Sequence, residues 1–214
     1  MTIIAVSLLL VALPNCTNTI ITHQQRQVFA QASDNNKNKN SLRTYENPAY
    51  GIQIQYLSTW IIYAGDMFSG DDAIDIVSFL GPVKSDTKAH APSLYISIIS
   101  PPSPPDLNLN EYLTRITNDY NAKLKEFKVI ESNTNSILAG KPAYKLVFTD
   151  EEDEIYYKTM DIGTIIGNKV YLLSYVAQRE QYSEYLRIIQ KMINSLKITT
   201  SNNGLDTEVL SSSA

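Results

Sequence analysis

The chain is short of the side chains that most often carry chemistry. It has one cysteine, Cys16, and two histidines, His23 and His90, among 214 residues. Cys16 lies next to an apolar N-terminal run, and no cysteine follows it. The sequence after Cys16 therefore offers no disulfide, no thiolate nucleophile and no zinc–thiolate site. Neither a G-x-G-x-x-G nor a P-loop pattern occurs, so a doubly wound nucleotide-binding fold is not expected.

Acidic residues and tyrosine are absent from the first 33 residues, where Arg26 is the only charged side chain. The chain has 18 Lys and Arg residues, so residues 34–214 contain 17 of them besides Arg26. The same residues contain all 22 Asp and Glu residues. This acidic balance disfavours a nucleic-acid partner, which requires a basic surplus. The 43% apolar and 19% charged composition is that of a globular domain, not of a polytopic membrane protein or a wholly disordered chain.

The N-terminus carries an uninterrupted apolar run, Ile3 to Leu13. The run has the length of the hydrophobic part of a secretory signal and is too short to span a bilayer, which takes roughly 20 residues. We therefore expect export, to the extracellular space or the outer face of the cell membrane. Two processing sites stay open: lipid attachment at Cys16, or cleavage after Ala30-Gln31-Ala32 to start at Ser33. The alternative is a buried helix of a cytosolic protein.

Composition divides the chain into four segments. Residues 1–32 form the leader, and residues 33–41 are rich in Asn and Lys and too polar to bury a core, so they are expected to be a disordered tether. Residues 199–214, rich in Ser, Thr and Asn, are expected to be a flexible tail. The folded domain is predicted to span residues 42–198.

Alternation of apolar and polar residues predicts mostly strands. Residues 50–56 alternate with a period of two, and Asn47-Pro48 favours a turn after a first short strand at 42–45. Gly167-Asn168 is suited to the positive φ angles of a tight hairpin turn. Further strands are expected at residues 60–63, 74–80, 94–99, 128–131, 136–138, 143–149, 155–166 and 169–176.

Two segments have a helical period instead. Apolar residues recur at helical spacing over residues 109–124, preceded by Asn108 with Glu111 in the pattern of an N-terminal capping box, and again over residues 182–196. Hairpins in series with two amphipathic helices indicate an α+β domain, with helices packed on an antiparallel sheet.

Three stretches, in their order and spacing, resemble the PsbP family. They are Tyr45 and Asn47 followed by residues 50–60 (YGIQIQYLSTW), residues 138–144 (LAGKPAY), and Lys169-Val170-Tyr171 with Tyr182 and residues 192–198 (MINSLKI). The first resembles the opening y-G-f-x-i-x-y-P-x-x-W pattern of the family, with Leu57 in the place of the proline. The second resembles its l-a-G-x-p-A-y turn. The resemblance covers nearly the whole domain.

This resemblance implies the α-β-α sandwich that PsbP shares with the Mog family, in which helices flank a central antiparallel sheet. It also implies an accessory binding protein without catalysis. Residues 34–44 do not resemble the segment by which plant PsbP docks on photosystem II, so a photosynthetic role is not implied. The family suggests a fold, and a fold alone does not assign a function.

The strongest electrostatic feature is a run of five carboxylates between two predicted strands. It consists of Asp150, Glu151, Glu152, Asp153 and Glu154. Carboxylate oxygens can hold Ca²⁺, although calcium loops interleave their ligands with Gly and Asn so that several oxygens converge. The alternative is a solvated acidic loop that blocks edge pairing of strands. Asp71, Asp72 and Asp75 form a smaller group with the same two interpretations.

Hydrolase chemistry has little support in the sequence. A serine triad would have to use His90, with Asp86 and Ser93 as neighbours, and no G-x-S-x-G elbow is present. Aromatic residues are expected mainly to pack the core, although they could line a ligand or protein contact. The set is Trp60, Tyr63, Tyr95, Tyr156, Tyr157, Tyr171 and Tyr175.

These observations rank three hypotheses. The first is an exported, non-catalytic PsbP-like domain that binds a protein or a small ligand, with membrane association through its N-terminus. The second is a protein that binds Ca²⁺ or another metal through residues 150–154, and the third is a hydrolase. The first predicts no cofactor and no nucleic-acid partner.

Overall fold

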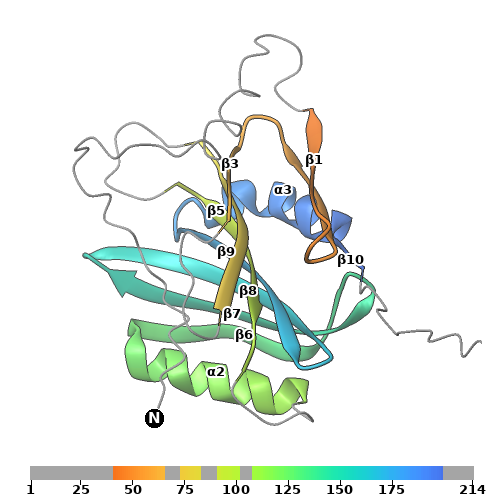
Figure 1. Cartoon of the computed structure of the whole chain (residues 1–214). Helices are drawn as coiled ribbons and strands as arrows, with labels where there is room; N and C mark the ends of the chain where they lie inside the picture. The colour runs from red at the N-terminus through yellow and green to blue at the C-terminus, as the bar shows by residue number, and fades with distance from the viewer. Residues whose placement is uncertain (1–40, 66–72, 83–90, 102–107, 200–214) are drawn as a thin grey trace, which may run out of the picture.

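A computed structural model describes residues 41–65, 73–82, 91–101 and 108–199 (Figure 1). Its elements are β1 (Leu42–Asn47), β2 (Ile52–Leu57), β3 (Ile61–Ala64), β4 (Ala73–Leu80), β5 (Ser93–Ile99), α2 (Leu109–Lys123), β6 (Lys125–Leu138), β7 (Lys141–Glu152), β8 (Ile155–Ile166), β9 (Lys169–Gln178), α3 (Tyr182–Ser195) and β10 (Lys197–Ile198). Neither helix of the described ranges is both long enough and apolar enough to cross a bilayer.

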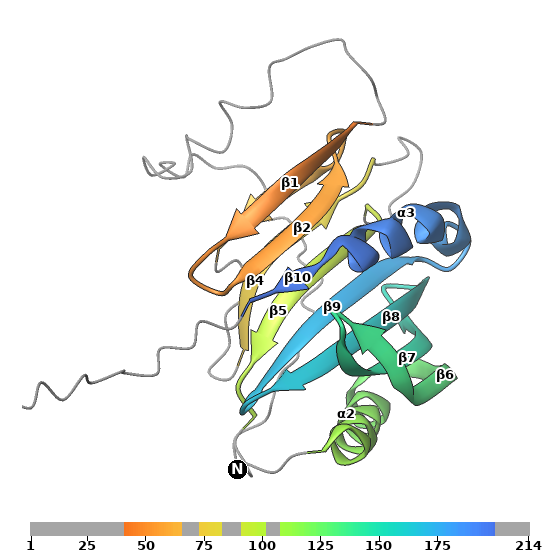
Figure 2. The same ribbon diagram turned by 90° about the vertical axis from the view of Figure 1, so that its right-hand side faces the viewer.

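The strands form two sheets, and all of their pairings are antiparallel. The larger sheet has seven strands in the order β3-β4-β5-β9-β8-β7-β6, so β3 and β6 are its edges. The smaller sheet has the order β1-β2-β10. Figure 2 shows the small sheet and α3 on one side of the large sheet, with α2 on the other side near β6 and β7.

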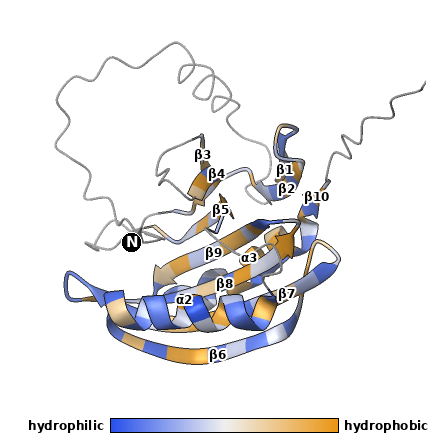
Figure 3. Ribbon diagram, turned by 60° about the horizontal axis from the view of Figure 1, so that its bottom comes forward, coloured by the Kyte–Doolittle hydropathy of each residue, from blue (hydrophilic) through white to orange (hydrophobic). Residues whose placement is uncertain are grey.

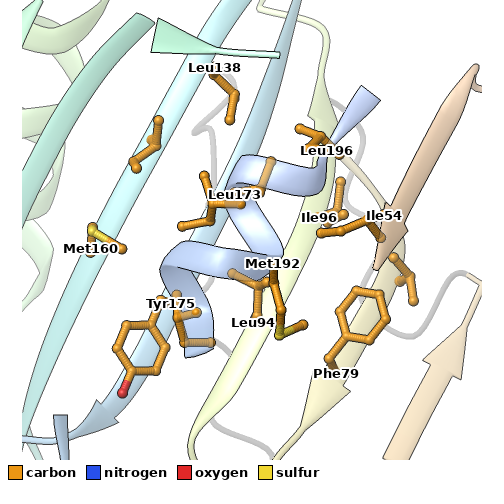
Figure 4. Close-up of a cluster of buried hydrophobic side chains, with 14 of the residues drawn as sticks. Ile54, Phe79, Leu94, Ile96, Leu138, Met160, Leu173, Tyr175, Met192 and Leu196 are labelled. Atoms are coloured by element: carbon orange, nitrogen blue, oxygen red, sulfur yellow. The ribbon is translucent and has the colours of Figure 1, made fainter. Parts of the chain in front are cut away.

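Alternation along the strands of the large sheet divides the core in two. On β7, Ala143 and Val147 belong to the cluster that contains Met192 of α3 and Ile54 of the small sheet. Figure 4 shows Ile54 and Met192 converging in this cluster with Phe79 and Leu173. The intervening residues of β7 belong to a second cluster with the apolar face of α2, which runs along the sheet in Figure 3. The second cluster contains Tyr112, Leu113, Ile116, Tyr120, Tyr144, Leu146, Phe148, Val170 and Leu172.

The α+β layout predicted from the sequence is confirmed, and the sandwich description holds in part. The described residues contain one helix on each face of an antiparallel sheet, and α3 shares its face with the three-stranded sheet. The domain is therefore mostly sheet, with helices that cover only part of each face.

The helix at residues 109–124 is confirmed together with its cap. The Glu111 N–H donates to Asn108 Oδ1 at 2.9 Å, which satisfies one of the free donors at the first turn of α2. The strand at residues 155–166 is confirmed with the bounds that the sequence predicted.

Two expectations were wrong. Residues 128–131 and 136–138 are not separate strands, because β6 runs without a break through Asn133, Thr134 and Asn135. Residues 150–154 are not an open loop, because β7 continues to Glu152 and only Asp153 and Glu154 form the turn. The pairing of β6 with β7 shifts register at bulges, where β6 has one residue more than the facing part of β7. These bulges bend β6 but leave it paired with β7.

Candidate functional site

The acidic run is part of a hairpin, and its side chains diverge. Asp153 and Glu154 occupy the turn with φ of 48° and 65°, the left-handed geometry of a tight two-residue connection. The preceding residues of β7 alternate between the two faces of the sheet, so Asp150 and Glu151 point to opposite sides. No group of three His, Cys, Asp or Glu side chains converges on a possible metal position within the described ranges. The structure therefore does not gather the run into one ligand cage.

Asp150 joins a buried polar layer between the large sheet and α2. Asp161 and Thr159 lie on the same face of β8, and all three side chains are at most 2% exposed. Tyr120 of α2 donates its hydroxyl to Asp161 Oδ2 at 2.9 Å. Asp150 Oδ1, Asp161 Oδ1 and Thr159 Oγ1 have no hydrogen-bond partner in the part of the chain that the structure describes. We call Asp150, Thr159, Asp161 and Tyr120 the buried acid layer.

Burial governs the protonation of both carboxyls in this layer. It raises the pKa of Asp161 to about 6, although hydrogen bonds from Ser174 and Tyr120 work in the opposite direction. Burial also raises the pKa of Asp150 to about 6, and the negative charges of Glu152 and Asp161 add to the effect. No ion pair reaches either carboxyl from a Lys or Arg of the described ranges. Both carboxyls therefore stay protonated to a higher pH than an exposed aspartate does.

Three buried tyrosines lie in or next to the buried acid layer. Burial raises the pKa of Tyr112, Tyr120 and Tyr144 above the ordinary value, so all three stay neutral. The Tyr144 ring lies over Gly163, where an added methyl group would come within 2.3 Å of the ring. The guanidinium of Arg115 lies 5.4 Å from the Tyr112 ring centroid. A closed layer of this kind offers its acids to no substrate from solution.

A second cluster lies on the opposite face, at the turn end of the hairpin, and all of its members except Glu151 are exposed. The strand registers align Lys125, Glu151 and Tyr156 side by side on β6, β7 and β8. The Arg179 N–H donates to the Tyr156 carbonyl at 3.0 Å, which adds a fourth residue to the line. We call Lys125, Glu151, Tyr156 and Arg179 the hairpin-end row.

The hairpin-end row is held together by charge and by stacking. Lys125 Nζ donates to Glu151 Oε1, and this bond raises the pKa of the lysine. The Arg179 guanidinium lies 4.9 Å from the Tyr156 ring centroid, in the geometry of a cation–π contact. Tyr156 is nevertheless 40% exposed. Tyrosine and arginine, together with tryptophan, are enriched among the residues that contribute most to protein–protein binding.

The other predicted aromatic residues are mostly core. Trp60 is buried, with its ring centroid 6.2 Å from that of Tyr185. Tyr157, Tyr171 and Tyr175 are buried as well. Tyr63 and Tyr95 are half-buried on β3 and β5, which leaves Tyr156 as the exposed member of the set.

The residues proposed for a hydrolase do not form a described site. His23, His90 and Asp86 lie outside the described residues, as do Cys16, Asp71 and Asp72. Ser93 is buried and donates its hydroxyl to the Ala91 carbonyl at 2.7 Å. Asp75 accepts from Ser97 Oγ at 2.5 Å.

Sequence reasoning missed Asp161 and Arg179, although the signal was present. A hairpin turn at residues 167–168 pairs residues whose numbers sum to 335, which places Asp161 opposite Ser174 and Tyr156 beside Arg179. The turn was predicted from the sequence. Extending its register along both strands would have located both clusters.

No protein-family model and no curated protein matches the chain. Among solved structures, cyanobacterial PsbP from Synechocystis sp. PCC 6803 is similar at 16% identity with a TM-score of 0.54, covering 74% of this chain and 93% of that one. Protein PA94 of Pseudomonas aeruginosa, described as of unknown function and a putative regulator, is similar at 11% identity with a TM-score of 0.51, covering 76% of this chain and all of that one.

These similarities define the fold of the protein. The chain has a PsbP-like fold, as the sequence resemblance implied. At such low identity the likeness shows the fold alone, so function has to be argued from the two clusters described above.

Proposed function

We propose that the chain is an exported, non-catalytic PsbP-like domain that binds a protein partner through the hairpin-end row. The observation that carries the proposal is the exposed stack of Tyr156 and Arg179 beside the Lys125–Glu151 pair. The row presents an aromatic ring and charges of both signs on β6, β7 and β8 and on Arg179, which directly follows β9. Such a mixed surface suits the polar contacts of a protein partner.

The arrangement of the acids supports a binding role over a catalytic one. The carboxyls with the most perturbed pKa values, Asp150 and Asp161, are closed off beneath α2. A general acid or base has to come within hydrogen-bond reach of its substrate. The buried acid layer is therefore out of reach of a substrate in solution, whereas the exposed row is available to a partner.

Capture from membrane extracts tests the proposed contact. The double variant Tyr156→Ala/Arg179→Ala removes the stack, and Arg187→Ala removes an exposed arginine on α3 as a matched control. Proteins crosslinked to the immobilised wild-type domain are quantified by mass spectrometry for all three forms. We expect a partner retained by wild type and Arg187→Ala and lost with the double variant, whose circular dichroism is unchanged. Equal capture by all three forms, or no partner, would overturn the proposal.

Export is supported by the apolar run of residues 3–13 and is tested separately. Mass spectrometry of the mature N-terminus distinguishes an acylated Cys16 from a start at Ser33. Placing a charge in the run, as in Leu9→Arg, should hold the full-length chain in the cytosol, whereas Cys16→Ser should affect only lipid attachment. Wild-type protein found in the cytosol with an unprocessed N-terminus would refute export without affecting the proposed contact.

A further inference from the structure

Strand β6 forms an open edge of the seven-stranded sheet. It has β7 on one side and no strand on the other among the described residues. Figure 3 shows it at the bottom of the view, below α2, with a hydrophobic stretch near the middle of the ribbon. Val129 and Ile130, in its N-terminal half, are 44% and 54% exposed. An edge strand with exposed branched side chains is a template for pairing with another strand.

We propose that two copies of this chain form a dimer by antiparallel pairing of their β6 strands about a two-fold axis between Val129 and Ile130. In this register, residues whose numbers sum to 259 stand opposite each other across the contact. Lys128 then faces Glu131 of the second copy, and Val129 faces Ile130 of the second copy. The two-fold axis repeats each pair, so the contact closes after two subunits.

The existing register places these charges on the correct side of the sheet. Lys128 stands beside Thr149 of β7, and Glu131 stands beside Val147. Thr149 and Val147 are two residues apart on one strand, so they share the face on which α3 lies. Lys128 and Glu131 therefore project from the same face, as a cross-strand ion pair requires.

The strand is complementary to itself, which favours a second copy over an unrelated chain. Over residues 127–132 the proposed register places no like charges opposite each other, because Lys128 faces Glu131 and Phe127 faces Ser132. Like charges directly opposite destabilise a strand pair, and opposite charges stabilise it. The bulges of β6 bend the strand but leave residues 125–134 exposed or half-buried.

Charge reversal tests the register directly. Sedimentation at about 100 μM, where a contact of micromolar affinity is mostly formed, should show wild type as a dimer. Lys128→Glu and Glu131→Lys should each weaken the dimer about tenfold or more, because each creates two like-charge pairs. An equimolar mixture of the two variants restores both attractive pairs, so a heterodimer should form.

A matched pair of isoleucine variants locates the contact. Ile130→Lys should give a monomer, whereas Ile61→Lys, at a similarly exposed isoleucine on the opposite edge strand β3, should leave the dimer intact. Thermal unfolding of each variant verifies that the domain is folded. A wild-type monomer at the highest concentration would overturn the proposal, and the bulges of β6 would then be devices that block edge pairing. A mixture of the charge variants that stays monomeric would overturn the register and with it the proposed contact.

Discussion

Replacing Asp161 by asparagine should make the domain more stable at neutral pH. The substitution keeps the shape of the side chain and an oxygen that can accept the hydrogen bond from Tyr120, 2.9 Å away in the wild type. It removes a carboxylate that must otherwise ionise while 1% exposed and without a cationic partner in the described ranges. An uncompensated buried charge is among the most costly features of a folded protein.

The magnitude follows from the pKa. Burial raises the pKa of Asp161 from 3.8 to about 6, and a difference of about 2 units corresponds to roughly 3 kcal/mol. The protonated form favours folding, so this contribution is fully present below the unfolded-state pKa of about 3.9. It is lost as the pH rises through the folded-state value of about 6. Asp150 adds a second contribution of the same sign over the same range.

Urea unfolding followed by Trp60 fluorescence, from pH 4 to pH 8, measures the effect. Wild type should lose stability between pH 4 and pH 6, and Asp161→Asn should lose less, so that the variant is the more stable form at pH 7.5. Asp153→Asn serves as a control, because Asp153 lies in the turn at φ 48°, a conformation that asparagine tolerates. An unchanged pH dependence in Asp161→Asn, or a variant less stable than wild type at pH 7.5, would refute the inference that the buried Asp161 carboxylate destabilises the domain when it ionises.

Three further predictions concern close packing and metal binding. Gly163→Ala should lower the free energy of unfolding by about 1–3 kcal/mol, measured by urea unfolding, because the added methyl group would come within 2.3 Å of the Tyr144 ring. Gly51→Ala should lower the melting temperature, since Gly51 has φ of 64° and an added Cβ would lie 1.8 Å from the Thr199 carbonyl oxygen. Calorimetry with millimolar Ca²⁺ should give no saturable heat, because the carboxylates of residues 150–154 diverge; a site of defined stoichiometry would contradict this geometry.

The elements that the sequence predicts best are those in which apolar residues recur with a single spacing along the whole segment. Strand β8 follows from its alternation and from the Gly167-Asn168 turn after it. Helix α2 follows from its apolar spacing and from Asn108 as its cap. In each case local conformation and burial depend on the same residues, so the pattern and the fold agree.

Strand β6 shows why the remainder is harder to predict. Asn133 and Asn135 favour turns, yet they continue the strand on either side of Thr134. An edge strand has one neighbour, and much of β6 is exposed, so it needs no alternation of apolar residues. What keeps these residues extended is pairing with β7, which depends on segments that lie further along the chain.

The acidic run illustrates the same limit for the candidate site. Five consecutive carboxylates indicate a solvated loop or a metal ligand set when they are considered alone. In the structure, the turn at Asp153 and Glu154 fixes the pairing of β7 with β8 and thereby separates Asp150 from Glu151. Composition identified the run, but only the register determines the surroundings of each of its members.

Two tight turns thus place both clusters of the domain. The turn at residues 153–154 aligns Glu151 with Tyr156, and the turn at residues 167–168 brings Arg179 alongside the same tyrosine. Side chains alternate between the two faces along each strand, so Asp150 of β7 and Asp161 of β8 lie on the opposite, buried face. One acidic segment therefore contributes to the pH-dependent stability of the interior and to the charge of the exposed surface. Substitutions at adjacent positions should separate these two effects because the sheet itself stands between them.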